Sequence, residues 1–365
     1  MNPLLDVDGL EVHFPITQGV LVQRTVGHVR AVDGVSLRIG RGETYGLVGE
    51  SGCGKSTLGR AVLKLTDPTA GTVTFDDVDV ASLSGEPLRR MRRRFQMVFQ
   101  DPLSSLDPRQ SVGSLLREGM AAHGLSTKDD GERLRGLMAA VGLPESALNR
   151  YPHEFSGGQR QRIGIARALC VEPDLIVADE PVSALDVSVQ AQVLNLLRSL
   201  QRELGLTYLV IAHDLAVVRH VSDTVGVMYL GSIVEEGPAH ELYDQPLHPY
   251  TRALLSAVPQ PDPDAEDTRE RILLTGDLPS PAAPPSGCRF HTRCPWRQAE
   301  RCDTERPELR TIDGGEHRVA CHYAEAIRDG RITPHEVSPE EAVSAPGAGP
   351  EVPEHTVSIT DAMGR

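Results

Sequence analysis

The sequence contains no hydrophobic run long enough to cross a membrane. Its longest apolar runs, such as residues 208–212, are far shorter than the ~18 residues that a spanning helix requires. Residues 1–8 do not combine a basic region with a following apolar one, so we expect no secretory signal. These absences predict a cytoplasmic protein.

Positive charge is also scarce. The 37 Lys and Arg residues face 51 Asp and Glu residues, which gives a formal net charge of −14. Nucleic-acid-binding domains are usually basic, so this balance argues against a nucleic-acid partner. A local cluster of arginines opposes the trend. Because no aromatic residues are interleaved with it, we interpret it as the solvated end of a helix before a strand at 95–99, in preference to a polyanion site. The cluster consists of Arg89, Arg90, Arg92, Arg93 and Arg94.

A glycine-rich segment at residues 49–57 predicts a phosphate-binding loop. It follows the apolar run 45–48, which is typical of a buried strand, and precedes residues 58–63, which are typical of a helix. Glycines let backbone N–H groups approach a triphosphate closely, and the helix N-terminus adds partial positive charge. We expect Lys55 to reach the β- and γ-phosphates and Ser56 to bind Mg²⁺; a chance glycine-rich turn is the alternative. The predicted nucleotide contacts here are Gly49, Ser51, Gly52, Cys53, Gly54, Lys55, Ser56 and Thr57.

The remaining pattern predicts an α/β protein. Residues 9–14, 31–39 and 71–75 are typical of strands, and we expect the first two to form a small antiparallel sheet. Residues from about 101 to 171 have helical spacing of apolar side chains. Strand and helix then alternate at 174–178, 187–204 and 207–212, which indicates a parallel sheet with helices on both faces.

Two carboxylates end the predicted strand at 174–178. Asp179 stands where it can hold the shell of Mg²⁺, and Glu180 can polarise an attacking water molecule. An acidic N-cap for the following helix is the alternative interpretation.

A second anion-binding turn lies between these two motifs. Residues 155–159, Phe-Ser-Gly-Gly-Gln, open a predicted helix at 163–169. This turn resembles the signature of the ATP-binding-cassette (ABC) family, with Phe155 in place of the usual leucine. Other positions resemble further family motifs in the family's order: Gln100 the Q-loop, residues 183–186 the D-loop, and His213 the switch histidine. Phe14 is the aromatic residue expected to stack on adenine.

The resemblance covers about residues 5–255 and implies a fold and a mechanism. The fold is a RecA-like P-loop NTPase core with an antiparallel β subdomain and a helical subdomain at about 101–171, all within an ATP-binding domain at 1–255. Two such domains pack head to tail, so that Ser156 and Gly158 serve the ATP held by the opposite subunit. Gln100 would join Ser56 and Asp179 around Mg²⁺, and Glu180, His213 and Gln100 would be the catalytic residues.

Within the family, several phrases resemble the ATPases of bacterial peptide importers. They are residues 32–36, 46–55 and 98–109, together with Leu-His-Pro-Tyr and its continuation at 247–255. Nickel and glutathione importers share this pattern, and a non-transport ABC ATPase acting on ribosomes or DNA is a more distant alternative. The resemblance implies a second ATPase subunit, identical or related, two transmembrane permease subunits, an extracytoplasmic substrate-binding protein, and a place at the cytoplasmic face of the membrane.

Four cysteines mark the predicted C-terminal region at 256–325. Persistent disulfides are unusual in a cytosolic chain, and four thiolates suit either zinc or an iron–sulfur cluster. The spacing contains no Cys-x2-Cys pair, and similar sets in this importer branch are associated with a 4Fe–4S cluster, so we favour that cluster over zinc and over free thiols. The set is Cys288, Cys294, Cys302 and Cys321. Residues 326–365 are expected to form a disordered tail, most clearly from about Ser338.

Overall fold

A mixed eight-stranded sheet forms the centre of the computed structural model, which describes residues 2–19, 24–101, 105–127, 130–258, 271–335 and 337. Its middle strands are parallel to one another, and β10, β12 and β11 extend one edge in antiparallel pairing. The strand order is β11 (Arg310–Thr311), β12 (Arg318–Val319), β10 (Ser232–Pro238), β9 (Thr224–Tyr229), β3 (Thr44–Val48), β8 (Thr207–Ala212), β7 (Leu175–Asp179) and β6 (Phe95–Val98).

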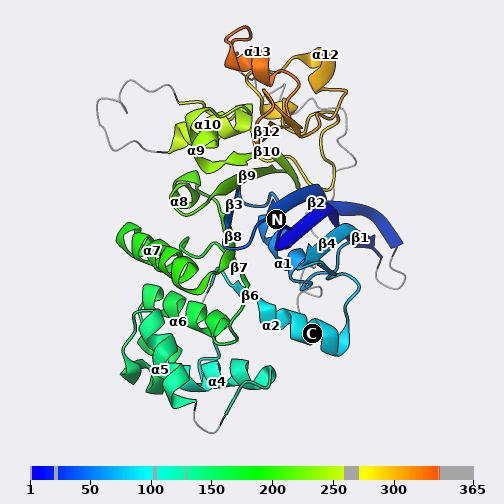
Figure 1. The fold of residues 1–365 in the computed structure, drawn as a ribbon. Helices are drawn as coiled ribbons and strands as arrows, with labels where there is room; N and C mark the ends of the chain where they lie inside the picture. The colour runs from blue at the N-terminus through cyan, green and yellow to red at the C-terminus, as the bar shows by residue number, and fades with distance from the viewer. Residues whose placement is uncertain are drawn as a thin grey trace.

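The parallel strands are apolar because both of their faces are covered. In β7, Leu175 and Val177 pack into the core shared with the N-terminal sheet, whereas Ile176 and Ala178 pack into the core on the opposite side. Figure 1 shows helix α7 (Val187–Leu204) on that second side and α1 (Lys55–Val62) between the two sheets. The predicted parallel sheet with helices on both faces is therefore confirmed.

The N-terminal residues form a separate four-stranded antiparallel sheet. Its order is β2 (Arg24–Ile39), β1 (Leu5–Gln18), β4 (Ala70–Phe75) and β5 (Val78–Asp79). The long pairing of β1 with β2 places Phe14 opposite Val29. The predicted antiparallel β subdomain is confirmed, with strands longer than the sequence pattern indicated.

Helices fill the region that the sequence assigned to them. They are α4 (Val112–Ala122), α5 (Gly131–Ala140) and α6 (Gly157–Leu169), with short 3₁₀ turns at Glu145–Asn149 and Pro152–Glu154. Figure 1 shows these helices gathered at one end of the molecule. Residues 102–104 of the predicted importer phrase lie outside the described residues.

Helix α2 (Gly85–Arg94) ends directly before β6 and carries the arginine cluster. Arg89 and Arg90 pair with Glu86 on the same helix, and Arg94 pairs with Asp174. The interpretation of these arginines as a helix end is confirmed.

The C-terminal region lies at the other end of the molecule (Figure 1) and joins the central sheet through β12. Its remaining elements are a 3₁₀ turn at His291–Arg293, α12 (Ala299–Cys302) and α13 (Ala324–Arg328). They follow α8 (Leu215–Arg219), α9 (Ala239–Asp244) and α10 (Pro249–Ala257). The predicted boundary at 255/256 falls inside α10. The predicted start of the tail at residue 326 is too early, since α13 continues through residue 326 and Ile327 is buried. Residues 336 and 338–365 lie outside the described residues.

Candidate nucleotide-binding and hydrolysis site

The segment 49–57 connects the buried end of β3 to the start of α1, the position that a phosphate loop requires. Its glycines are needed sterically. A Cβ on Gly54, whose φ is +108°, would lie 1.9 Å from the carbonyl oxygen of Ala31, and one on Gly49 would lie 2.2 Å from that of Met228. Neighbouring backbone thus packs directly against the loop and holds its shape.

Lys55 lies under this loop and is buried. Its ammonium group donates hydrogen bonds to the carbonyl oxygens of Gly49 (2.7 Å) and Glu50 (3.0 Å). Cys53 is also buried, and burial raises the pKa of its thiol, so the side chain is a neutral packing group. Ser51 and Gly52 are exposed at the tip, and Thr57 is half-buried in the first turn of α1.

Ser56 and Asp179 lie side by side, as the predicted Mg²⁺ site requires. The Ser56 hydroxyl donates to Asp179 Oδ1 at 2.7 Å. Burial raises the pKa of the Asp179 carboxyl group, and the hydrogen bond from Ser56 counters part of that rise. A hydroxyl and a carboxylate are oxygen ligands of the type that Mg²⁺ prefers. Gln100, the third predicted ligand, contacts Glu180 instead.

Glu180 is the point where the predicted catalytic residues meet. Its Oε2 accepts a hydrogen bond from Gln100 Nε2 at 2.8 Å and lies 3.7 Å from His213 Nδ1. Its backbone has a φ of +47°, and its N–H donates to Ile211 O at 2.9 Å. The Asp179 carboxylate contacts Ser56, whereas the Glu180 carboxylate contacts Gln100, so the two neighbouring side chains have different partners.

The predicted D-loop joins this arrangement. Both the backbone N–H and the hydroxyl of Ser183 contact the carbonyl oxygen of Glu180. Gln100 and Glu180 line a hollow together with residues 183–185 and Gly157 of the signature turn. Gln100, Glu180 and the signature turn of one chain are therefore neighbours.

The signature turn caps α6. The hydroxyl of Ser156 accepts from the N–H of Gln159 (3.4 Å), whose side chain accepts from the N–H of Ser156 (3.1 Å). Ser156 is exposed, whereas Gly158 is buried. A Cβ on Gly158 would lie 2.4 Å from Val189 Cγ1, so this glycine also permits α6 to pack closely against α7.

Phe14 and the four C-terminal cysteines lie outside the set of contacts around Glu180. Phe14 lies in β1 with 38% of its surface exposed.

Cys288 donates its backbone N–H to Cys302 O at 2.8 Å, and burial raises the pKa of all four thiols of the C-terminal set. Charge on other thiols of the set adds to the rise in the pKa of Cys288, Cys294 and Cys321.

Sequence reasoning missed two residues outside the recognised hydrolysis motifs that contact the nucleotide site. Arg293 pairs with Glu50 of the phosphate loop, and the Tyr250 hydroxyl accepts from the N–H of Glu50. Tyr250 belongs to the recognised Leu-His-Pro-Tyr phrase, so that phrase could have directed attention to this contact. The sequence offers no comparable signal for Arg293.

The Leu-His-Pro-Tyr phrase is itself anchored by a buried carboxylate. Both oxygens of Glu235 are used: the N–H groups of Leu247 and His248 donate to them at 2.7 and 2.9 Å, and His317 Nε2 lies 2.8 Å away. This anchor positions the start of α10 and so places Tyr250 against the phosphate loop.

Comparisons with known proteins agree with this geometry. The model of the ABC transporter family matches residues 32–183, and that of the oligopeptide/dipeptide transporter C-terminal region matches residues 234–302. Two solved cassettes are similar in fold. The structure of cbiO1 of Clostridium perfringens has a TM-score of 0.58 and 27% identity, covering 67% of this chain and 92% of cbiO1. The dimeric cassette MJ0796 bound to ADP and Pi has a TM-score of 0.57 and 28% identity, covering 64% of this chain and 98% of MJ0796. The fold and site therefore define an ABC ATPase.

Curated relatives identify the branch. The oligopeptide transport ATP-binding protein AppF of Bacillus subtilis is 56% identical over 321 residues, covering 87% of this chain and 97% of its own length. Its counterpart OppF of Salmonella typhimurium is 53% identical over 322 residues, covering 87% and 95%. The chain belongs to the family of oligopeptide-transport ATP-binding proteins of ABC transporters. None of the helices in the described ranges has the length and apolar character needed to cross a bilayer.

Proposed function

We propose that this chain hydrolyses ATP to drive the import of oligopeptides or dipeptides through a membrane transporter. The observation that carries the hydrolytic part is the convergence of Gln100 and His213 on Glu180, next to the Ser56–Asp179 pair. The peptide part is supported by the similarity to AppF and OppF over nearly their whole length.

The residues take roles that follow from their positions. Residues 49–57 wrap the phosphates, Ser56 and Asp179 hold Mg²⁺ with Gln100 approaching it, and Glu180 orients water for attack. His213 supports Glu180, and Phe14 offers an exposed ring to adenine. The exposed Ser156 and its neighbour Gly158 serve the ATP of a second ATPase subunit.

The proposed transporter contains further subunits beside this chain. They are a second ATPase subunit, two transmembrane permease subunits and an extracytoplasmic substrate-binding protein. The chain would lie at the cytoplasmic face of the membrane, held there by the permeases.

The four C-terminal cysteines are proposed to hold a 4Fe–4S cluster, with zinc as the alternative. Sulfurs bound tetrahedrally to one zinc ion at about 2.3 Å lie about 3.8 Å apart. Within the described residues, no three of these sulfurs lie within 4.8 Å of one another. The measurement is the iron, sulfide and zinc content of anaerobically purified protein. Cys302→Ser should lose the metal. Cys170→Ala, a change outside the set of four cysteines, should keep it. Wild-type protein without iron or zinc would leave the thiols free and refute both forms.

The transport assignment is tested by uptake of a labelled di- or oligopeptide in the native host, with any parallel peptide importer deleted. Glu180→Gln should abolish uptake at an unchanged protein level. Glu203→Gln, on the exposed side of α7, is the matched control and should leave uptake unchanged. Normal peptide uptake by Glu180→Gln would refute the assignment, and uptake assays with nickel and glutathione would then test the alternative cargoes.

A further inference from the structure

The C-terminal region reaches the phosphate loop through a bidentate ion pair. Arg293 Nη1 lies 2.7 Å from Glu50 Oε2, and Arg293 Nη2 lies 3.1 Å from Glu50 Oε1. The arginine side chain is only 7% exposed. A fork-to-fork pair fixes both the position and the orientation of a carboxylate, which a single contact does not.

The backbone of the same loop residue is held by a side chain of α10. The N–H of Glu50 donates to the Tyr250 hydroxyl at 2.8 Å. The ring of Tyr250 packs against Tyr229 and Phe290, with ring centroids 4.8 and 5.4 Å away. Phe290 precedes Arg293 by three residues, so α10 and the turn that carries Arg293 pack together and hold Glu50 by its main chain and its side chain.

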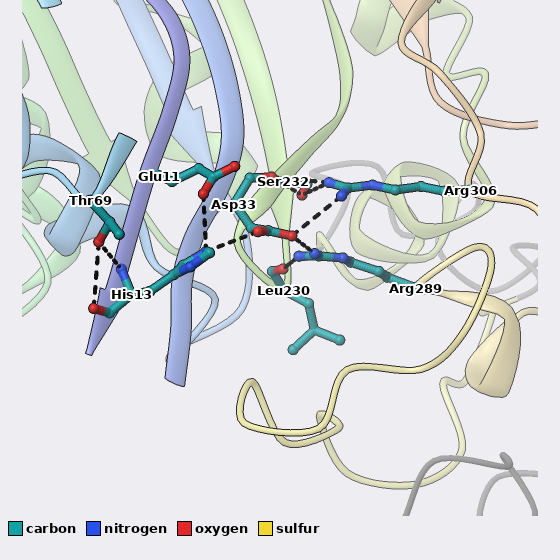
Figure 2. A network of polar contacts seen from close by, with 8 residues as sticks. All are labelled: Glu11, His13, Asp33, Thr69, Leu230, Ser232, Arg289 and Arg306. Atoms are coloured by element: carbon teal, nitrogen blue, oxygen red, sulfur yellow. Dashed lines mark hydrogen bonds and ion pairs between the residues drawn. The ribbon is translucent and has the colours of Figure 1, made fainter. Parts of the chain in front are cut away.

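A separate network holds the loop at Cys53. Figure 2 shows Arg289 and Arg306 approaching Asp33 from one side and His13 from the other. The N–H of Asp33 donates to Gly231 O, and the N–H of Gly231 donates to Cys53 O, each at 2.8 Å. The loop is thus fixed at Glu50 and at Cys53, and the C-terminal region contributes to both attachments.

We propose that Arg293 is a positioning residue for ATP: by fixing Glu50, it holds the phosphate loop in the shape that receives the triphosphate. Backbone N–H groups bind phosphate well only when they already point at one centre, because ordering them on binding would consume part of the binding free energy. The C-terminal region therefore contributes to ATP binding by positioning the phosphate loop. The inference rests on the proposed assignment of residues 49–57 as the phosphate loop.

The test is a double-mutant cycle on the full-length chain, with the dissociation constant of a fluorescent ATP analogue as the readout. Arg293→Gln and Glu50→Gln should each raise this constant about 5-fold or more. The double variant should be no worse than either single one, because both changes remove the same interaction. The matched control is Arg310→Gln, which breaks a bidentate pair with Glu325 wholly inside the C-terminal region and should leave the constant unchanged.

Denaturant unfolding without nucleotide separates positioning from general loss of stability. Arg293→Gln should weaken ATP binding far more than Arg310→Gln even where the two lower the free energy of unfolding equally. Equal dissociation constants for Arg293→Gln and wild type, or additive effects in the double variant, would overturn the inference. Lys55→Ala tests the underlying assignment separately: if it binds ATP normally, residues 49–57 are not the phosphate loop.

Discussion

The side-chain amide of Gln100 donates a hydrogen bond to the carboxylate of Glu180 at 2.8 Å, joining the end of β6 to the end of β7. The same oxygen of Glu180 lies 3.7 Å from His213, which follows β8. Since the carboxyl ends of adjacent parallel strands meet at one edge of the sheet, three residues separated by up to 113 positions become neighbours. Glu180 is therefore in contact with residues that follow both neighbouring strands.

Replacing this central carboxylate should separate ATP binding from hydrolysis. Glu180→Gln keeps the size of the side chain but removes the charge that orients water, so we expect the rate of phosphate release to fall by about 10²- to 10⁴-fold. The dissociation constant for ATP should change little, because Lys55, Ser56 and Asp179 remain. Glu203→Gln should retain the wild-type rate. A Glu180→Gln enzyme that hydrolyses ATP as fast as this control would contradict the assigned role.

Gly54 should tolerate no side chain. Its φ of +108° is unfavourable for any other residue, and a Cβ at this position would lie 1.9 Å from the carbonyl oxygen of Ala31. We expect Gly54→Ala to lose ATP binding, measured by equilibrium titration. Gly136→Ala is the control: it lies within α5, where a Cβ would meet nothing within 4 Å, and should raise the free energy of unfolding by up to about 1 kcal/mol. Normal ATP binding by Gly54→Ala would show that the loop can rearrange freely.

Asp33 should contribute stability that acid removes. Burial raises the pKa of its carboxyl group, but Arg289, His13 and Arg306 outweigh burial and hold the pKa below the ordinary value of 3.8. The ionised form is therefore favoured by folding, and its contribution is complete above that value and lost as the pH falls through the lowered pKa. Asp33→Asn leaves the buried Arg289 without a charged partner, and should cost about 3–5 kcal/mol at pH 7.

The measurement for Asp33 is urea unfolding of wild type and Asp33→Asn over a pH series. The difference in the free energy of unfolding measured at about pH 5 should shrink as the pH falls below 3.8. Asp6→Asn, which disturbs an exposed pair with Arg38, is the control and should cost about 1 kcal/mol or less. A difference for Asp33→Asn that grows as the pH falls would reverse the sign and refute the argument.

The sequence predicted the features that depend on neighbouring residues, but not the contacts between residues far apart in the chain. The phosphate loop, the strand ending in Asp179, and the order of the motifs are local patterns, and the structure has them where they were expected. The pairing of β12 with β10 and the contact of Arg293 with Glu50 join segments 82 to 243 residues apart. No periodicity records such a contact, so the sequence predicted a C-terminal region at 256–325 but not its contacts with the central sheet and the phosphate loop.

The exposed hydroxyl of Ser156 allows the cross-subunit role to be separated from simple helix capping. Ser156→Ala should lower the free energy of unfolding by about 1 kcal/mol, because α6 loses its cap. If the hydroxyl also contacts the partner's ATP, removing a hydrogen bond to a charged group should slow hydrolysis by about 10- to 100-fold. ATP affinity of the isolated chain should not change, since its own phosphate loop is intact.

Ser111 provides the matched control for this last prediction. It caps α4 as Ser156 caps α6, with its hydroxyl accepting from the N–H of Ser114 at the same 3.4 Å. Ser111→Ala should therefore cost similar stability and leave hydrolysis at the wild-type rate. If both variants slow hydrolysis equally, the effect of Ser156 is one of capping alone. A loss of hydrolysis confined to Ser156→Ala, with ATP affinity preserved, requires that this turn act on a nucleotide that its own chain does not hold.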